Sequence, residues 1–372
     1  MSDDRPEPDR IAGAPHPRET ATQFGQDAAA ESFLAAFKSG RLHSGWLITG
    51  PRGVGKATLA WKIATFLLAQ PVEDGGLFGA APAPETLHIS PEHPDARLVQ
   101  SGAHPRLFVV RRPYDDKTGK LKADITVDAV RGLKGFFQMS AADGGRRVVI
   151  VDAADDMNRN AANAILKELE EPPALATLLL IAHQPSRLLP TIRSRCRVLR
   201  CAPLAAPDLA AALDQAGHPA AGSEALAALA AGSAGDAIAL LNHDGLARYA
   251  EIVALFDKLP SVDRTRALAL ANACTGAPNV ARYDLTLDLI DQFLARAARS
   301  GLQGPPATQG AAGEARLMAR IAPDDRAARA WAQVQQDLST RIRHGKAVNL
   351  DPAALVLDIV FKIEDTARAV LA

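Results

Sequence analysis

The sequence predicts an α/β domain with a five-stranded parallel sheet and a phosphate-binding loop, followed by two helical regions. Continuous apolar runs alternate with helical patterns over residues 18–203, and a glycine-rich turn joins the first run to a helix. After Pro203 the chain becomes alanine-rich with helical spacing. Because strands of a parallel sheet are covered on both faces, they are continuously apolar rather than alternating.

The first region contains five apolar runs of strand length and three helical patterns between them. The expected strands are residues 46–49, 107–110, 148–152, 178–181 and 198–199. The expected helices are residues 59–69, 126–137 and 160–171. Residues 71–106, rich in proline, glycine and histidine, interrupt this alternation, so we expect a surface insertion there.

Composition shifts suggest four segments. Residues 1–17 are acidic and proline-rich, which predicts a disordered tail. The P-loop domain covers 18–203, a small helical lid domain 204–245, and a helical C-terminal oligomerisation (collar) domain 246–372. Three stripes of the last segment predict core packing: Leu285, Leu289 and Phe293; Trp331, Val334, Leu338 and Ile342; Leu355, Ile359 and Ile363.

Charge and cysteine content exclude several classes. Lys+Arg and Asp+Glu both count 42, so no overall basic field indicates nucleic acid. The three cysteines, Cys196, Cys201 and Cys274, are too few for a tetrathiolate zinc site, so no metal is expected. No apolar run approaches the roughly 20 residues that a membrane helix needs, and we expect a soluble, cytoplasmic protein without membrane partners.

A phosphate-binding motif, G-x-x-x-x-G-K, lies between the first expected strand and helix. It includes Gly50, Gly53, Gly55 and Lys56. Glycines let the loop wrap so that its amides and the following helix N-terminus face phosphate oxygens, and the lysine adds a cation. The pattern predicts a nucleotide site, with ATP as the candidate ligand.

Two groups that hydrolysis needs are absent from this pattern. Ala57 stands where Ser or Thr would bind Mg²⁺, and Thr58 is a poor substitute because one helical residue turns its side chain by about 100°. Asp152 ends a strand like the metal-associated aspartate of NTPases, but Ala153 replaces the water-activating glutamate. We expect Asp155 and Asp156 to be solvated. The pattern predicts a vestigial nucleotide site, at which ATP binding can survive although turnover is lost.

Two further runs resemble bacterial DNA polymerase III clamp-loader subunits, which are AAA+ proteins. They are residues 163–173, NAILKELEEPP, and 187–196, RLLPTIRSRC, which contains the family's motif Ser194-Arg195-Cys196. Residues 40–47 and 127–131 fit the same family. The resemblance is densest over 18–203, and a three-part layout extends it to the C-terminus.

Within this family the chain resembles the delta-prime branch. The gamma/tau branch keeps a Ser/Thr, a glutamate and an arginine at the positions of Ala57, Ala153 and Gly235. The four-cysteine zinc module of many members is missing here, so the resemblance carries over no metal. The P-loop is better formed than in some members, which leaves nucleotide binding open.

The resemblance implies a non-hydrolysing stator subunit. Arg195, flanked by Ser194 and Cys196, would reach the ATP of a neighbouring ATPase subunit as an arginine finger. The implied partners are gamma/tau and delta, and through the complex the sliding clamp and primer-template DNA. The chain would belong to a DNA-directed DNA polymerase holoenzyme without being catalytic itself.

Three alternatives stay open from the residues. The chain could be an active gamma/tau-type ATPase, or a sensor that binds ATP without hydrolysing it. A weaker alternative is DNA binding through the basic cluster of Arg341, Arg343, His344 and Lys346. His183 follows an expected strand where ATPases often carry a polar sensor, and its role is undecided.

Overall fold

The computed structural model describes residues 7–71, 83–139, 144–218 and 223–372. The chain divides into two compact units: Met1–Pro219 with Gly232–Asp236, and Ala220–Ala231 with Ala237–Ala372. We call them the sheet unit and the helical unit. The helices of residues 204–245, expected as a lid, are shared between the two units.

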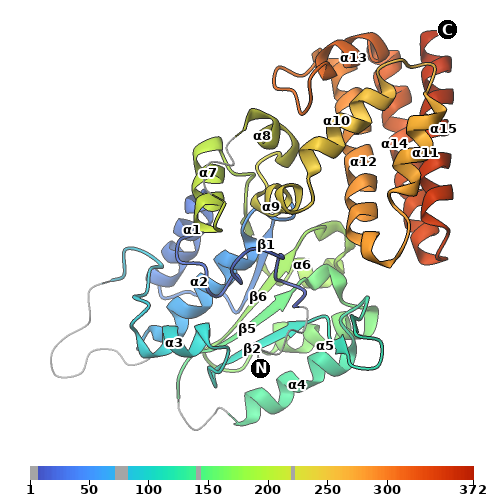
Figure 1. Ribbon diagram of the computed structural model, residues 1–372. Coiled ribbons are helices and arrows are strands. Elements are labelled where there is room, and N and C mark those ends of the chain that lie inside the picture. Colours follow the sequence, from blue (N-terminus) through green and yellow to red (C-terminus); the bar gives the residue numbers. More distant parts are fainter. Residues whose placement is uncertain (1–6, 72–82, 140–143, 219–222) are drawn as a thin grey trace. The chain divides into compact units, whose positions relative to one another are not determined.

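The sheet unit contains the predicted five-stranded parallel sheet (Figure 1). Its strands lie in the order β2-β5-β6-β1-β7, and all neighbours are parallel. All five expected strands are confirmed. Their bounds are β1 Gly45–Thr49, β2 Leu107–Arg111, β5 Arg147–Asp152, β6 Ala176–Ala182 and β7 Arg197–Arg200.

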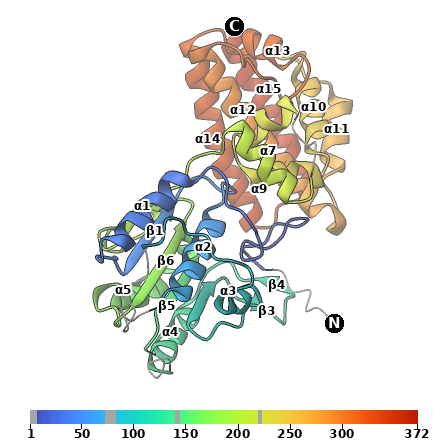
Figure 2. The same cartoon turned by 90° about the vertical axis from the view of Figure 1, so that its left-hand side faces the viewer.

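Helices cover both faces of this sheet, and Figure 2 shows α1 and α2 near β1 and β6. Helices α1 (Asp27–Lys38) and α2 (Lys56–Ala69) pack on the face that carries Trp46 and Ile48. Helices α4 (Val127–Met139) and α5 (Arg159–Glu170) pack on the face that carries Leu47. Both faces are buried because successive residues of a strand point to opposite sides.

The expected insertion is partly structured. Residues 72–82 lie outside the described residues, but Pro94–Gln100 form helix α3, and Val99 is buried in the core beside α2. His93 caps this helix by accepting a hydrogen bond from the Asp95 amide. Residues 83–106 lie largely at the surface, as expected, and Val99 anchors them to the core.

The expected tail also differs from its prediction. Residues 1–6 lie outside the described residues, whereas residues 7–18, which we call the N-terminal strap, make defined contacts. His16 is fully buried, and its ring meets Trp61 of α2 edge-on at 5.6 Å. Glu7 and Asp9 are among the acidic residues that indicated disorder, and they form ion pairs with Arg18 and Arg111.

Short elements complete the sheet unit. Tyr114–Asp115 (β3) and Lys120–Leu121 (β4) form a small antiparallel hairpin that the sequence analysis did not predict. Two turns of 3-10 helix follow β5 and β6, at Ala154–Asp156 (η2) and Pro185–Arg187 (η3). Helices α6 (Pro190–Arg193) and α7 (Ala206–Gln215) flank β7 in sequence.

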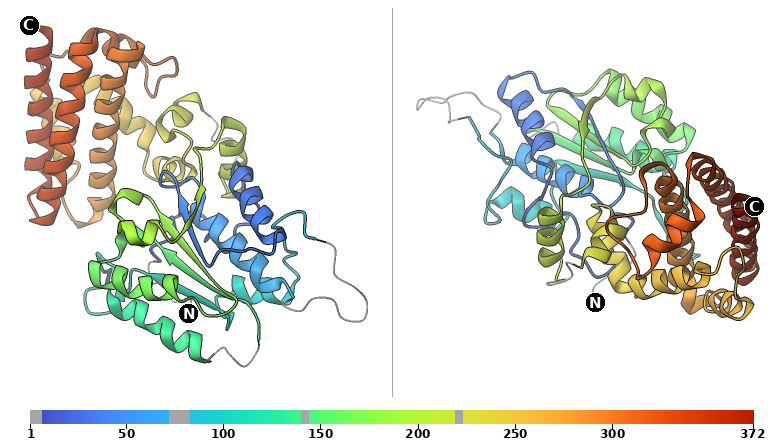
Figure 3. Two further views of the ribbon diagram at one scale, coloured as in Figure 1. Left: turned by 180° about the vertical axis from the view of Figure 1, so that it is seen from behind. Right: turned by 90° about the horizontal axis from the view of Figure 1, so that it is seen from above.

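The helical unit confirms the predicted stripes as core, with Leu289, Phe293, Trp331 and Ile359 almost completely buried. Its long helices α12, α14 and α15 lie side by side (Figure 3). The elements are α8 Glu224–Ala230, α9 Ala234–Asn242 (which crosses the unit boundary), α10 Gly245–Phe256, α11 Arg264–Asn272, η4 Ala277–Asn279, α12 Val280–Gln303, α13 Glu314–Ile321, α14 Asp325–Ala347 and α15 Pro352–Leu371.

Within the described ranges, no single helix is long and apolar enough to cross a membrane. The helices α8 and α9 meet the length and composition test only when they are counted together.

Candidate functional site

The phosphate-binding loop connects the carboxyl end of β1 to the N-terminus of α2. Gly53 and Gly55 have φ angles of 73° and 96°, in the left-handed region that glycine tolerates best. Helix α2 begins at Lys56 directly after them. The sequence motif thus adopts the tight strand–loop–helix geometry that it predicted.

The lysine of this loop bonds to the loop itself. Lys56 is only 3% exposed, and its Nζ donates to the carbonyl oxygens of Gly50, at 2.8 Å, and Pro51. Burial lowers the pKa of Lys56 to about 8. To contact an incoming phosphate, the Lys56 amine would have to give up its hydrogen bonds to these two backbone carbonyls.

Asp152 ends β5 as predicted and is paired with Arg111 in the sheet register. Its carboxyl group is buried at the edge of the sheet where the phosphate-binding loop begins. Burial, followed by repulsion from the Asp9 carboxylate, raises the pKa of Asp152 to about 7. Asp9, from the N-terminal strap, is therefore a close electrostatic neighbour of this predicted site residue.

The expectation of solvated carboxylates is wrong for Asp155. Asp155 is 8% exposed, and its two carboxylate oxygens accept the backbone amides of His183 and Gln184, each at 3.0 Å. It links the ends of β5 and β6 because both strands end at the same edge of the sheet. Asp156 is more exposed and forms an ion pair with Arg112 at 3.3 Å.

His183, whose role the sequence left undecided, lies in the field of the loop. Burial, and then the charge of Lys56, lowers the pKa of His183 to about 4. The imidazole is neutral at physiological pH, and its backbone amide is held by Asp155. A neutral ring beside Lys56 can accept or donate a hydrogen bond without adding charge to the site.

The structure gives the loop no replacement for the missing metal ligand. Ala57 packs against the hydrophobic core, and Thr58 is half-buried at the next helical position. Ala153 is buried beside Asp152 and offers no carboxylate. The loop amides and Lys56 fit a phosphate group, whereas Mg²⁺ would lack its hydroxyl ligand at Ala57.

The start of α9 covers the loop within the sheet unit. The Gly235 amide donates to the Gly53 carbonyl at 3.0 Å. A Cβ atom added to Gly235 would lie 2.8 Å from Gly53 Cα and 2.9 Å from Ile11 Cδ1. Any side chain at position 235, including an arginine, would therefore push apart the loop, α9 and the N-terminal strap.

Arg195 lies just after the end of α6, between Ser194 and Cys196 of the sequence motif. Its guanidinium forms an ion pair with Glu170 of α5 at 2.8 Å and donates to the Thr191 carbonyl at 3.1 Å. The Arg195 side chain is 37% exposed and that of Glu170 is 47% exposed. The pair is half-solvated, so it exchanges partners at a low cost in free energy.

The flanking residues support the position of this arginine. The Ser194 hydroxyl donates to the Thr191 carbonyl at 3.1 Å, closing the turn after α6. Cys196 packs against the core of α4 and α5, and burial raises the pKa of its thiol to about 12. The thiol is therefore protonated and contributes to packing.

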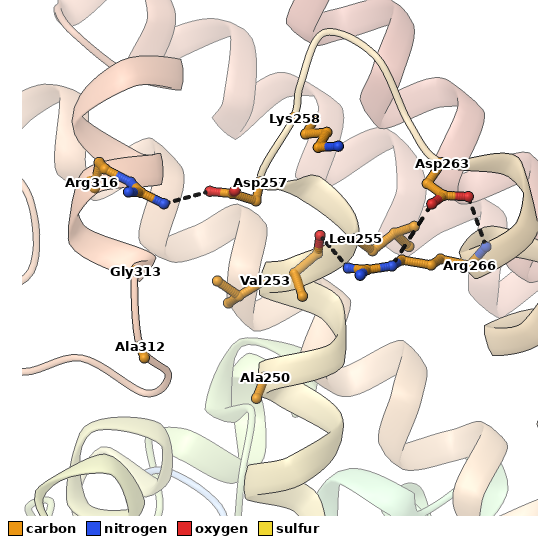
Figure 4. Close-up of a pocket in the computed structure, with 11 residues that line it drawn as sticks. Ala250, Val253, Leu255, Asp257, Lys258, Asp263, Arg266, Ala312, Gly313 and Arg316 are labelled. Atoms are coloured by element: carbon orange, nitrogen blue, oxygen red, sulfur yellow. Dashed lines mark hydrogen bonds and ion pairs between the residues drawn. The ribbon is translucent and has the colours of Figure 1, made fainter.

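A cavity of about 320 Å³ lies in the helical unit among α10, α11 and α13 (Figure 4). Four of its charged residues form two ion pairs: Arg316 with Asp257 at 3.3 Å, and Arg266 with Asp263 at 3.8 Å. None of the motif residues lines it. No group of three or more His, Cys, Asp or Glu side chains able to hold a metal occurs in the described part of the chain.

Three residues near this site were not predicted from the sequence: Asp9 and His16, which contact each other, and Arg111, which binds Asp9 and is paired with Asp152 in the sheet. The first two fall in the segment expected to be disordered, and Arg111 looked like an ordinary strand end. The sequence signal for them is the grouping of Glu7, Asp9 and His16 within one polar segment. Nothing in the sequence indicates that they fold back onto β2.

Comparison with known proteins identifies relatives of this chain. A family model described as "DNA polymerase III, delta subunit" matches residues 25–205. DNA polymerase III subunit delta' of Pseudomonas aeruginosa is 42% identical over 193 residues, 50% of this chain and 52% of that protein. The Escherichia coli subunit delta' is 34% identical over 247 residues, 65% of this chain and 68% of that protein.

The tau subunits are more distant. The Salmonella typhimurium DNA polymerase III subunit tau is 28% identical over 180 residues, 48% of this chain and 25% of that protein. This chain spans about half the length of the Pseudomonas aeruginosa subunit delta'. The relatives thus include both the delta' and the tau type of subunit.

Proposed function

This chain belongs to the family of DNA polymerase III delta-prime subunits, and on that basis we propose that it is a non-hydrolysing stator in a clamp loader. In this role it would present Arg195 to ATP bound on a neighbouring ATPase subunit. Its all-helical C-terminal unit would join a collar of subunits.

One observation carries the proposal. The phosphate-binding loop retains its glycines and Lys56 but has alanine at both positions that hydrolysis requires, whereas Arg195 remains half-exposed beside a single carboxylate. Loss of the metal ligand and of the water-activating base lowers the rate of phosphoryl transfer by orders of magnitude. The arginine is of use to a neighbour because it is not committed to a buried ion pair.

Arginine has the chemistry that this role needs. A planar guanidinium stays charged and can bind two phosphate oxygens at once, so it suits the charge that develops on a transferred phosphoryl group. To act on a neighbour, Arg195 would leave Glu170, and the exposure of both side chains makes this exchange inexpensive.

The partners follow from this role. We propose binding to gamma/tau and delta subunits and, through the complex, to the sliding clamp and primer-template DNA in the cytoplasm. The clamp loader would place the clamp on DNA for a DNA-directed DNA polymerase. The chain itself would contribute position and charge without turning over ATP.

The test is the DNA-stimulated ATPase rate of a complex assembled with the ATPase subunits. The change Arg195→Ala should lower the rate by about 10³-fold or more if this arginine acts as a finger. Arg193→Ala is the matched control, because Arg193 is an exposed arginine two residues earlier and should leave the rate unchanged. Equal rates for the Arg195→Ala and unmodified complexes would remove the finger role.

A second candidate function is nucleotide sensing, because the loop glycines and Lys56 fit a phosphate group. It predicts ATP binding by the isolated chain without turnover. A gamma/tau-type ATPase would instead show steady hydrolysis that Lys56→Ala abolishes. An ATPase assay of the isolated chain, combined with a nucleotide titration with and without Mg²⁺, separates the three functions.

A further inference from the structure

The N-terminal strap folds over the carboxyl edge of the sheet, where the phosphate-binding loop begins. Arg111, the last residue of β2, binds two strap carboxylates: Asp9 through Nη1 at 2.9 Å and Glu7 through Nη2 at 3.0 Å. Arg18 also pairs with Glu7, at 3.4 Å. The strap is thereby attached beside Asp152, the neighbour of Arg111 in the sheet.

A buried histidine fastens the same segment. His16 accepts the Arg18 amide at Nδ1, at 3.1 Å. Nε2 faces the Asp9 carboxylate, with 3.1 Å between Nε2 and Oδ2. The Asp9 side chain is 1% exposed, and its interactions with His16 and Arg111 keep its pKa below the usual value although burial raises it.

The strap contacts the start of α9, which covers the phosphate-binding loop, and the residues that follow the strap contact the loop itself. Ile11 lies against Gly235, which is bonded to Gly53 of the loop. Farther along, Gln23 lies so close to Gly55 that a Cβ atom there would be 2.7 Å from Gln23 Nε2. Gln26 donates to the Val54 carbonyl at 3.0 Å.

The strap also ties up a cation that a nucleotide could use. Asp9 and Glu7 both bind the Arg111 guanidinium at this edge of the sheet, beside Asp152. Lys56, a second cation, is already bonded to Gly50 and Pro51. A triphosphate entering this edge must therefore displace contacts that the folded chain already makes.

We propose that the N-terminal strap is a built-in occupant that keeps nucleoside triphosphates out of the phosphate-binding loop. Asp9, His16 and Arg111 hold it closed, and Ile11 packs on Gly235 beside the loop. The strap explains why glycine stands at position 235, since an arginine there would displace Ile11. This inference goes beyond the stator role and does not depend on Arg195.

The test is the affinity of the isolated full chain for a fluorescent ATP analogue, measured with and without Mg²⁺. Deletion of residues 2–17 should tighten binding by about 10- to 100-fold, because apparent affinity falls with the fraction of binding-competent molecules. In the full-length chain, Glu7→Gln combined with Asp9→Asn should tighten binding in the same direction. This second variant keeps the strap's bulk and provides a result if the deletion variant does not fold.

Two controls define the site. Arg10→Ala changes an exposed strap residue and should leave the affinity unchanged. Adding Lys56→Ala to the strap variants should abolish the gain, because the gained binding uses the phosphate-binding loop. The proposal is overturned if neither strap variant binds more tightly than the full chain, or if the gain survives Lys56→Ala.

Discussion

Two buried clusters of charged groups in this chain are built differently. In the helical unit, Glu314 is completely buried and accepts from Tyr249 Oη at 2.6 Å, Arg296 Nη2 at 3.0 Å and the Gly310 amide at 2.6 Å. Its oxygens thus have donors from three parts of the unit. The cluster joins α10, α12 and the segment before α13.

Near the phosphate-binding loop the charges are less well matched. Among the described residues, no ion pair joins Asp152 to a basic side chain, and Lys56 bonds to carbonyl oxygens. Burial raises the pKa of Asp152 to about 7 and lowers that of Lys56 to about 8. Charges that are buried without an ionic partner are typical of ligand-binding sites. The paired Glu314 cluster, in contrast, has a structural role.

The largest expected effect is in the helical unit. Glu314→Ala leaves the Arg296 guanidinium buried without its carboxylate, and we expect a loss of about 3–5 kcal/mol in the free energy of unfolding. Chemical denaturation followed by circular dichroism measures it. Glu224→Ala, at an exposed position of α8, is the control and should change stability by less than about 0.5 kcal/mol. A comparably small loss for Glu314→Ala would mean that the cluster is not a structural ion pair.

Asp152→Asn should raise the free energy of unfolding instead of lowering it. The folded pKa of about 7 lies above the ordinary value of 3.8, so the folded protein holds a proton that the unfolded chain has lost. The stability contribution of Asp152 therefore falls as pH rises from about 4 to about 7 and is constant above that. Asp152→Asn should stabilise the protein by up to about 4 kcal/mol at pH 8 and hardly at pH 4.

Denaturation of Asp152→Asn and the unmodified chain at pH 4, 6 and 8 measures this window. Asp128→Asn is the control, because Asp128 is an exposed carboxylate at the start of α4. A constant difference across the three pH values would show that Asp152 is ionised in the folded protein.

A smaller loss is expected for Tyr249→Phe. It removes the hydroxyl that donates to Glu314 and keeps the buried ring and the Arg296 pair. A hydrogen bond to a charged group contributes about 1.5–3 kcal/mol, so the free energy of unfolding should fall by that amount. If the loss equals that of Glu314→Ala, the tyrosine and not the ion pair stabilises the cluster.

The smallest effect is expected at the cavity rim. Arg316 and Asp257 are paired at 3.3 Å, but their side chains are 79% and 42% exposed. Exposed pairs contribute about 0–1 kcal/mol, so Arg316→Ala should change the free energy of unfolding by less than about 1 kcal/mol. Repeating the measurement at high salt should abolish even that difference. A larger change would show that this pair stabilises the fold as the buried Glu314 cluster does.

The sequence determined the architecture of the sheet unit. Its five strands, the loop between β1 and α2, and Asp152 at the end of β5 follow from apolar runs, glycines and helix breaks, which are local signals. The apolar stripes of α12, α14 and α15 likewise predicted their buried faces. The alanines at positions 57 and 153 are visible in the printed sequence and need no structure to interpret.

Contacts between distant segments could come only from the folded chain. The strap meets β2 across about a hundred residues, and Gly235 meets Gly53 although nothing in either segment specifies the other. Asp155 looked solvated because its partners, the amides after β6, carry no sequence signal. Burial and pKa shifts depend on which groups surround a side chain in three dimensions, and the local pattern of the sequence does not specify those neighbours.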